Sequence, residues 1–142
     1  MPIRNEVFLD ASYAIAITNP KDRHHDRAVA ISEELEANNV RLVTSHAILL
    51  EIGNGLSKAR FRQGAQALLE SIHSDPAIEI VPITAELYTN AFTLFSRRPD
   101  KEWGLTDCVS FEIMRRRSIA NALTADDHFI QAGFVALLLA EA

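Results

Sequence analysis

Cysteine is nearly absent from this sequence, and its scarcity narrows the chemistry that the chain can carry. Cys108 is the single cysteine, so no internal disulfide can form, and the composition fits a reducing cytoplasm. A zinc centre, which needs several cysteine or histidine ligands, has no suitable set here. Cys108 itself lies in an apolar helical pattern, which predicts a small buried side chain rather than a nucleophile.

Long hydrophobic runs, linkers and an excess of positive charge are also lacking. No run of about 18 apolar residues occurs, so we expect no membrane-spanning helix. Glycine and proline number 5 each, no linker rich in either occurs, and no repeat divides the chain, so we expect a single domain over residues 1–142. The net charge of −5 argues mildly against a broad basic surface for nucleic acid.

Short apolar runs alternate with helical patterns along the chain, which is typical of an α/β protein with a parallel sheet. The expected strands are residues 7–10, 41–45, 78–83 and 119–124, with a weaker fifth at 134–138. The expected helices are residues 26–39, 47–59, 62–73, 84–98 and 106–117. Thr84 and Thr106 are predicted N-caps, because an acid follows each in the first helical turn. We therefore predict a central, mostly parallel sheet of four to five strands, flanked by helices on both faces.

Four acids stand close to the ends of these predicted elements. Asp10 closes the first strand, Asp126 follows the strand at 119–124, and Asp107 lies in the first turn of a helix. Glu51 interrupts an apolar run where a solvent-facing acid is not expected. A helix cap or a solvated turn explains each acid taken alone, but not all four together.

Carboxylates that pack together repel one another unless a cation lies among them. Catalytic groups of parallel sheets gather where the carboxyl ends of the strands meet, so the four acids predict a divalent-metal site at that edge. Mg²⁺ prefers oxygen ligands, and Mn²⁺ is the expected substitute. Two such ions about 4 Å apart would stabilise both the attacking and the leaving oxygen in phosphodiester cleavage.

The four acids lie in segments that resemble a known family. These segments are FLDAS (8–12), SHAILLEIGNGL (45–56), DKEWGLTDCVSFEIMRRR (100–117) and ALTADDHFIQAGF (122–134). In order and spacing they resemble the acidic motifs of PIN domains, most closely those of small single-domain bacterial proteins such as the VapC-type toxins. The resemblance covers essentially the whole chain. One departure is Gly104, where close relatives often have serine, and it puts any hydroxyl contribution there in doubt.

The resemblance implies a PIN-like three-layer fold and a magnesium-dependent endoribonuclease whose products carry 5′-phosphate and 3′-hydroxyl ends. It matches the acidic quartet of the family to Asp10, Glu51, Asp107 and Asp126. In the segment ADDH, the family pattern makes Asp126 the inward ligand, and Asp127 is interpreted as a solvated acid at a helix start. His128 is expected to pack or to cap locally, and Phe129 to anchor the turn in the core.

Several neighbouring side chains are candidates to position these acids. Ser12 corresponds to the hydroxyl residue of the family's D-x-[ST] motif and is expected to bond a ligand carboxylate, although an N-cap role explains it equally well. Asn54 lies one helical turn after Glu51, so it either orients that carboxylate or is a polar residue at a helix boundary. Thr106 and Thr124 could steer ligands similarly, although capping also explains Thr106.

Candidates for phosphate contacts precede the third motif, in a predicted loop: Arg97, Arg98 and Lys101. Trp103 could stack on a base, but a single tryptophan beside a motif is more often a core residue. The arginines at 115–117 are favoured as a solvated helix end over an RNA contact, because cations suit the helix dipole there.

Three functions are compatible with these patterns. The first is a metal-dependent endoribonuclease acting on RNA as the toxin of a toxin–antitoxin pair. The second is a non-catalytic PIN-fold module that binds RNA or protein, and the retention of all four acids argues against it. The third is a phosphoacceptor domain of the response-regulator type, which needs paired acids after the first strand, and the segment FLD lacks that pair.

Apolar residues on the helical segments 26–39 and 47–73 predict a protein partner. They occupy more than one helical stripe, which is more apolar surface than one sheet face needs: Leu49, Leu50, Phe61, Leu68 and Leu69. We expect a two-fold homodimer, as in relatives of this size, with an antitoxin segment in a groove between two acidic sites. An arginine or lysine of that segment would compete with metal for the acids.

Overall fold

A five-stranded sheet forms the centre of the computed structural model, which describes residues 5–140. Its strands are β1 (Glu6–Leu9), β2 (Arg41–Ser45), β3 (Ile78–Val81), β4 (Asn121–Leu123) and β5 (Val135–Ala136). Their order in the sheet is β3-β2-β1-β4-β5, and every neighbouring pair is parallel. The predicted parallel sheet is therefore confirmed, including its weak fifth strand.

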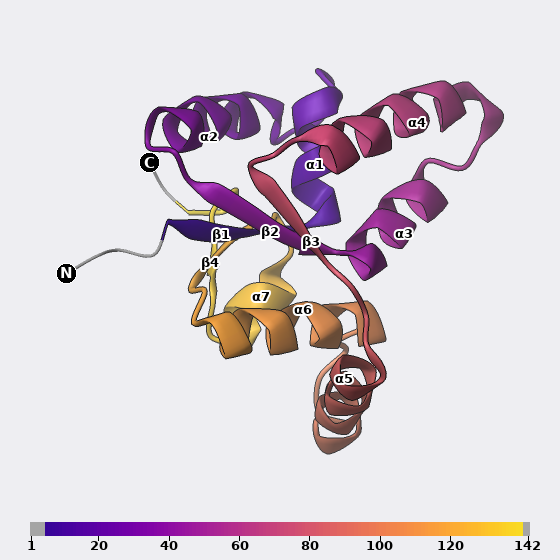
Figure 1. Cartoon of the computed structure of the whole chain (residues 1–142), viewed down its shortest axis with the longest axis vertical. Helices are drawn as coiled ribbons and strands as arrows, with labels where there is room; N and C mark the ends of the chain where they lie inside the picture. The colour runs from indigo at the N-terminus through magenta and orange to yellow at the C-terminus, as the bar shows by residue number, and fades with distance from the viewer. Residues whose placement is uncertain (1–4, 141–142) are drawn as a thin grey trace.

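Helices cover the sheet on both sides. They are α1 (Ala11–Thr18), α2 (His25–Ala37), α3 (His46–Gly55), α4 (Ala59–Ser74), α5 (Ala85–Arg97), α6 (Leu105–Arg117) and α7 (Asp127–Gln131). Figure 1 shows α1 to α4 on one side of the sheet and α5 to α7 on the other, so the chain forms three layers. In residues 5–140 no helix is long and apolar enough to cross a membrane.

The helix N-termini show where local sequence decides the structure. Thr84 caps α5 as predicted, because its hydroxyl oxygen accepts a hydrogen bond of 3.1 Å from the Leu87 backbone N–H. The predicted cap at Thr106 is wrong. Gly104 is the N-cap of α6, and the Asp107 carboxylate accepts a hydrogen bond of 3.0 Å from the Gly104 backbone N–H. Asp107, the acid of this motif, thus takes part in capping the N-terminus of α6.

Helix α1 has no counterpart among the predicted elements, and α7 is predicted only as a helix start at Asp127. Helix α1 begins directly after Asp10, and four of its eight residues are buried: Ala11, Tyr13, Ala14 and Ala16. A helix that is apolar on most sides lacks the polar stripe that helical periodicity detects. The expected bounds of α2 to α4 differ from the observed ones by a few residues, as helix ends commonly do.

Aromatic side chains fill the core between the sheet and α6. Phe129 is fully buried and meets Phe111 edge to face, with ring centroids 5.0 Å apart. Trp103, which is 6% exposed, also meets Phe111 edge to face, with ring centroids 5.1 Å apart, and Cys108 is fully buried. The predicted anchoring of the last motif by Phe129 and the core placements of Trp103 and Cys108 are confirmed.

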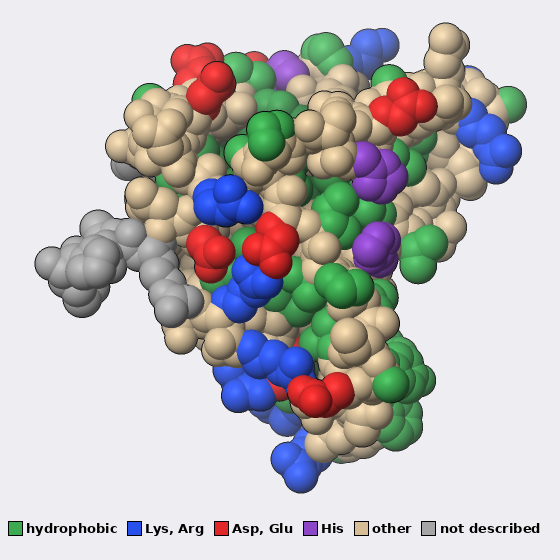
Figure 2. Space-filling view, in the orientation of Figure 1, with side chains coloured by type: hydrophobic (Ala, Val, Ile, Leu, Met, Phe, Trp, Pro, Cys, Tyr) green, Lys and Arg blue, Asp and Glu red, His purple; other side chains and the backbone are tan. Residues whose placement is uncertain are grey.

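The surplus of apolar side chains lies elsewhere than predicted. Leu49 is buried, and Leu68 and Leu69 are half-buried against the core, so only Leu50 and Phe61 of the expected surface remain exposed. Helix α3 and the segment that includes α5 carry the larger exposed group, namely Leu50, Ile83, Tyr88, Phe92 and Phe95. We call this group the α3–α5 apolar surface. Figure 2 shows hydrophobic side chains gathered at the lower right, over α5.

Candidate active site

Asp10 lies where β1 ends and α1 begins, beside the end of β4 in the sheet. Its Oδ2 accepts hydrogen bonds from the Ser12 hydroxyl at 2.9 Å and from the Thr124 hydroxyl at 2.7 Å. Ser12 in turn accepts a bond of 3.0 Å from the Ala125 backbone N–H. The two hydroxyls therefore connect the ends of β1 and β4 and hold one carboxylate in place.

The environment of Asp10 opposes its ionisation. Burial raises the pKa of this carboxyl above its usual value, while the hydrogen bonds from Thr124 and Ser12 partly offset the rise. The negative charge of Asp126 raises the pKa further. Because the side chain is only 6% exposed, solvent cannot screen that repulsion effectively.

Asp126 follows β4 and caps α7. Its Oδ1 accepts a hydrogen bond of 2.9 Å from the His128 backbone N–H, and its own backbone N–H donates to Thr124 Oγ1 at 3.0 Å. Asp126 is half-buried, whereas Asp127 is exposed and accepts a bond of 3.3 Å from the Gln131 amide. The two adjacent acids thus have different surroundings, and only Asp126 belongs to the Thr124 network.

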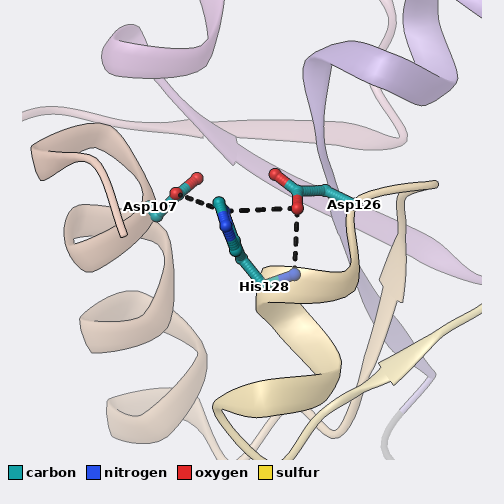
Figure 3. A group of neighbouring side chains, drawn as sticks. All are labelled: Asp107, Asp126 and His128. Carbon is teal, nitrogen blue, oxygen red and sulfur yellow. Dashed lines mark hydrogen bonds and ion pairs between the residues drawn. The ribbon is translucent and has the colours of Figure 1, made fainter. Parts of the chain in front are cut away.

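His128 lies between two of the acids. Its Nδ1 is 3.2 Å from Asp107 Oδ2 and 3.3 Å from Asp126 Oδ1, as Figure 3 shows. The expected local role is present in the backbone bond to Asp126, but the ring also contacts Asp107 on α6, which the sequence did not predict. The ligand atoms of Asp107, Asp126 and His128 all lie within 4.8 Å of one another, close enough to share one cation.

The pKa of the Asp107 carboxyl is raised, first by burial and then by the charge of Asp126. The hydrogen bond from the Gly104 backbone and the nearby His128 oppose the rise without cancelling it. The ionised form of Asp107 is thus disfavoured in a site that offers it no lysine or arginine among the described ion pairs.

Glu51, the fourth acid, lies on α3, on the other side of the sheet from α6. Its pKa is raised to about 7, first by desolvation of the carboxyl group and then by the charges of Asp10, Asp107 and Asp126. The residue as a whole is exposed, and it lines a surface hollow together with Asn54 and Thr106. Asn54 is therefore beside Glu51, as its helical spacing predicts, and Thr106 lines the same hollow from α6.

The three candidate phosphate contacts lie at the far end of α5. Arg98 forms a two-pronged ion pair with Asp100, with both N···O distances at 2.9 Å, and its guanidinium also lies over the Trp103 ring. Lys101 lies over the same ring at 5.9 Å, and Arg97 is exposed. Arg98 and Lys101 line a second surface hollow together with Phe92, Phe95 and Trp103, apart from the hollow that contains Glu51.

The donor set fits a hard divalent cation. Four carboxylates from four separate chain segments offer oxygen ligands. The charges of Asp10, Asp107 and Asp126 raise the pKa of the fourth carboxyl, that of Glu51, as expected for like charges that repel one another. A cation bound among them would remove this repulsion. Asp107 and Asp126 would both bind this cation. Asp10 and Glu51 are close enough for their charges to interact with each other, and the charges of Asp107 and Asp126 also act on Glu51.

The chain belongs to the PIN domain family, whose model matches residues 7–135. Because the PIN domain is a nuclease domain, membership supports the prediction that this chain is a ribonuclease.

One curated relative is the 23S rRNA-specific endonuclease VapC20 of Mycobacterium tuberculosis. It is 30% identical over 130 residues, which cover 91% of this chain and 95% of the relative.

Solved structures share the fold of this chain. The crystal structure of M. tuberculosis VapC20, described as a sarcin–ricin loop cleaving toxin, matches with a TM-score of 0.79 at 28% identity, covering 91% of this chain and 96% of that one. VapBC2 from Rickettsia felis, bound to a promoter DNA fragment, matches with a TM-score of 0.68 at 19% identity, covering 92% and 96%. FitAcB from Neisseria gonorrhoeae matches with a TM-score of 0.64 at 20% identity, covering 92% and 94%.

Proposed function

We propose that this chain is a divalent-metal-dependent endoribonuclease and the toxin of a toxin–antitoxin pair. The observation that carries the proposal is the gathering of Asp10, Glu51, Asp107 and Asp126 at one edge of the sheet, with raised pKa values at three of them. A cluster of this kind opposes folding unless it binds a cation. The 30% identity to an RNA-cleaving endonuclease, over 91% of this chain, supports RNA as the substrate.

The residues of the chain have distinct tasks in this scheme. A divalent cation, when bound, supplies Lewis-acid activation of water and of the scissile phosphate. Asp10, Glu51, Asp107 and Asp126 would hold it, and their oxygen ligands, taken alone, make Mg²⁺ the expected ion and Mn²⁺ its substitute. Ser12 and Thr124 position Asp10 through hydrogen bonds of 2.9 and 2.7 Å, so this ligand is held in place before metal binds. No protein nucleophile is required.

Binding of RNA would use the surface around the acids. Asn54 and Thr106 line the hollow next to Glu51 and can contact sugar or phosphate groups there. Arg97, Arg98 and Lys101 would contact phosphates further along the strand, and Trp103 fixes the orientation of Arg98 and Lys101 through cation–π contacts at 5.1 and 5.9 Å.

Purified protein incubated with ribosomal RNA tests the proposal. We expect cleavage with Mg²⁺ or Mn²⁺, no cleavage after chelation, and products with 5′-phosphate and 3′-hydroxyl ends. Because VapC20 is named for 23S rRNA, that RNA and a hairpin with the sarcin–ricin loop sequence are the first substrates to compare with a scrambled hairpin. RNA binding without metal-dependent cleavage would favour the non-catalytic module instead.

An antitoxin would act by placing a cation among the acids. An arginine or lysine from a partner segment would form charge-assisted hydrogen bonds with the carboxylates and exclude metal. The candidate partner is a small protein encoded by the neighbouring gene. It should suppress cleavage, and Asp107→Asn should weaken its binding. Unchanged binding by Asp107→Asn would contradict insertion of the cation and leave steric blocking as the means of inhibition.

A homodimer would bury the α3–α5 apolar surface. Tyr88 and Phe92 stack on each other with ring centroids 6.4 Å apart and remain 48% and 50% exposed, which is unusual for large apolar side chains of a monomer. An isologous contact would use the same patch on both subunits. Light scattering from micromolar concentrations upward should show a dimer, and Phe92→Ser should shift it to monomer. Phe61→Ser, an exposed aromatic position outside this surface, is the control; a monomer throughout would overturn the dimer.

A further inference from the structure

We propose that His128 is a direct ligand of the cation, so that the metal site contains nitrogen as well as oxygen and prefers Mn²⁺ to Mg²⁺. The proposal deepens the proposed function and rests on it, because it concerns the same site. The acidic motifs alone assign only carboxylates to the metal. The structure adds an imidazole nitrogen 3.2 Å from Asp107 Oδ2 and 3.3 Å from Asp126 Oδ1.

His128 Nδ1 has hydrogen-bonding geometry toward Asp107 Oδ2, and its distances to the two carboxylates also fit coordination of a shared cation. The mode for an N–H···O hydrogen bond is about 2.9 Å, and the single N–H of a neutral Nδ1 cannot align with two carboxylates at once. Donor atoms about 2.1 Å from a common ion, at roughly 90° to 109° from one another, lie about 3.0 to 3.4 Å apart. The distances of 3.2 and 3.3 Å fall within that range.

The local fold holds the ring in this place. Asp126 accepts the His128 backbone N–H at 2.9 Å, so the same carboxylate that would bind metal also sets the first turn of α7. Phe129, the next residue, is fully buried and packs against Phe8 and Phe111, which anchors this turn in the core. On the other side, the Gly104 backbone N–H holds Asp107 Oδ2 at 3.0 Å. Figure 3 shows the ring directed into the gap between the two carboxylates.

The nitrogen ligand has a consequence for the choice of ion. Mg²⁺ takes oxygen ligands almost exclusively, whereas imidazole suits the first-row transition metals, whose affinity for such sites rises from Mn²⁺ to Cu²⁺ and falls again at Zn²⁺. A site of two carboxylates and one imidazole therefore selects a first-row divalent ion over Mg²⁺ or Ca²⁺. Asp10 and Glu51, which lie outside the group of three, remain available for an ion with oxygen ligands only.

Pulsed electron paramagnetic resonance on Mn²⁺ added to the wild-type protein tests the proposal without reference to activity. We expect modulation from a directly coordinated imidazole nitrogen in the wild type and its loss in His128→Gln. His73→Gln, an exposed histidine at the end of α4, should keep the modulation. In parallel titrations, His128→Gln should lower Mn²⁺ affinity by about tenfold or more and Mg²⁺ affinity by less than about threefold.

Each result decides the question. Bound Mn²⁺ with no nitrogen modulation in the wild type would overturn ligation by His128 and leave the carboxylate metal site standing. Equal losses of Mn²⁺ and Mg²⁺ affinity in His128→Gln would also overturn it, because the ring would then act only by orienting the carboxylates. Absence of any Mn²⁺ binding to the wild type would overturn both this inference and the proposed function.

Discussion

The two ends of α6 differ in how their charged side chains are paired. At the N-terminal end, Asp107 lies beside Asp126 and His128, and the described ion pairs include no lysine or arginine at this cluster. At the C-terminal end, acids and arginines alternate, as Figure 2 shows in blue and red. There Arg115 pairs with Glu112, Arg116 with Glu86 and Glu112, and Arg117 with Glu6 and Glu79.

The same contrast appears in the pKa values of two glutamates. The hydrogen bond from Arg117 lowers the pKa of Glu79, whereas desolvation and neighbouring acids raise that of Glu51 to about 7. Charges at the C-terminal end stabilise the fold, while those at the N-terminal end repel one another. Like charges held together at a cost in stability mark a functional site, and balanced charges mark a structural one.

Among the changes considered, replacement of Asp10 should have the largest effect on RNA cleavage. Asp10→Asn should reduce RNA cleavage by more than about a hundredfold, because it removes a ligand from chemistry worth several kcal/mol. The metal-free fold should be as stable as the wild type or more stable, because a disfavoured charge is removed. Cleavage rates and melting curves in chelator measure both effects.

The matched control for Asp10 is Asp26→Asn, an acid in the first turn of α2. It should leave cleavage unchanged. An Asp10→Asn protein that cleaves RNA at a wild-type rate would remove Asp10 from the site.

Divalent metal should raise the melting temperature by binding to the acids at the N-terminal end of α6. At a concentration roughly 100 times the dissociation constant, Mg²⁺ or Mn²⁺ should add about 2.7 kcal/mol and raise Tm by several degrees. Ca²⁺ should also stabilise the protein but support cleavage poorly, because its looser coordination suits in-line attack less well. Absence of a shift with both Mg²⁺ and Mn²⁺ at millimolar levels would contradict a metal site.

Stability without metal should rise as the pH is lowered from about 8 to 5. The native state holds a proton on Glu51 up to a pKa of about 7, while the unfolded chain releases it near 4.5, so the native state binds more protons in this window. Because the residue is exposed, screening limits the gain to about 1 kcal/mol. Melting curves of wild type and Glu51→Gln in chelator measure it, and the variant should lose most of the slope. An equal slope in both proteins would reject Glu51 as its source.

The arginines at the other end of α6 should affect stability but not catalysis. Arg117→Ala should lower stability by about 1 kcal/mol, because it removes ion pairs with Glu79 and Glu6 that are only partly exposed. RNA cleavage and the metal-induced shift in Tm should stay unchanged. A double-mutant cycle with Glu79→Ala measures the coupling, and a loss of cleavage in Arg117→Ala would break the division between the two ends.

Sequence patterns predicted the sheet and the positions of the acids, because buried strands and motif spacing leave local signals. They missed α1, whose nearly uniform apolar character hides its helical period. They also predicted a local role for His128 and missed its contact with Asp107. The two residues are 21 positions apart in the sequence, so their contact depends on how α6 packs against α7. The exposed apolar side chains lie mainly on α5 and not on the helices predicted to carry them. The reason is the same, since tertiary packing decides which of several apolar stripes is covered.

The measurement that tests the central account most directly is Mg²⁺-dependent RNA cleavage by the adjacent pair Asp126→Asn and Asp127→Asn. The two variants remove the same charge from neighbouring positions, one in the Thr124 network and one exposed. We expect Asp126→Asn to lose cleavage and its metal-induced rise in Tm, and Asp127→Asn to keep both. An inactive Asp127→Asn beside an active Asp126→Asn would contradict the account.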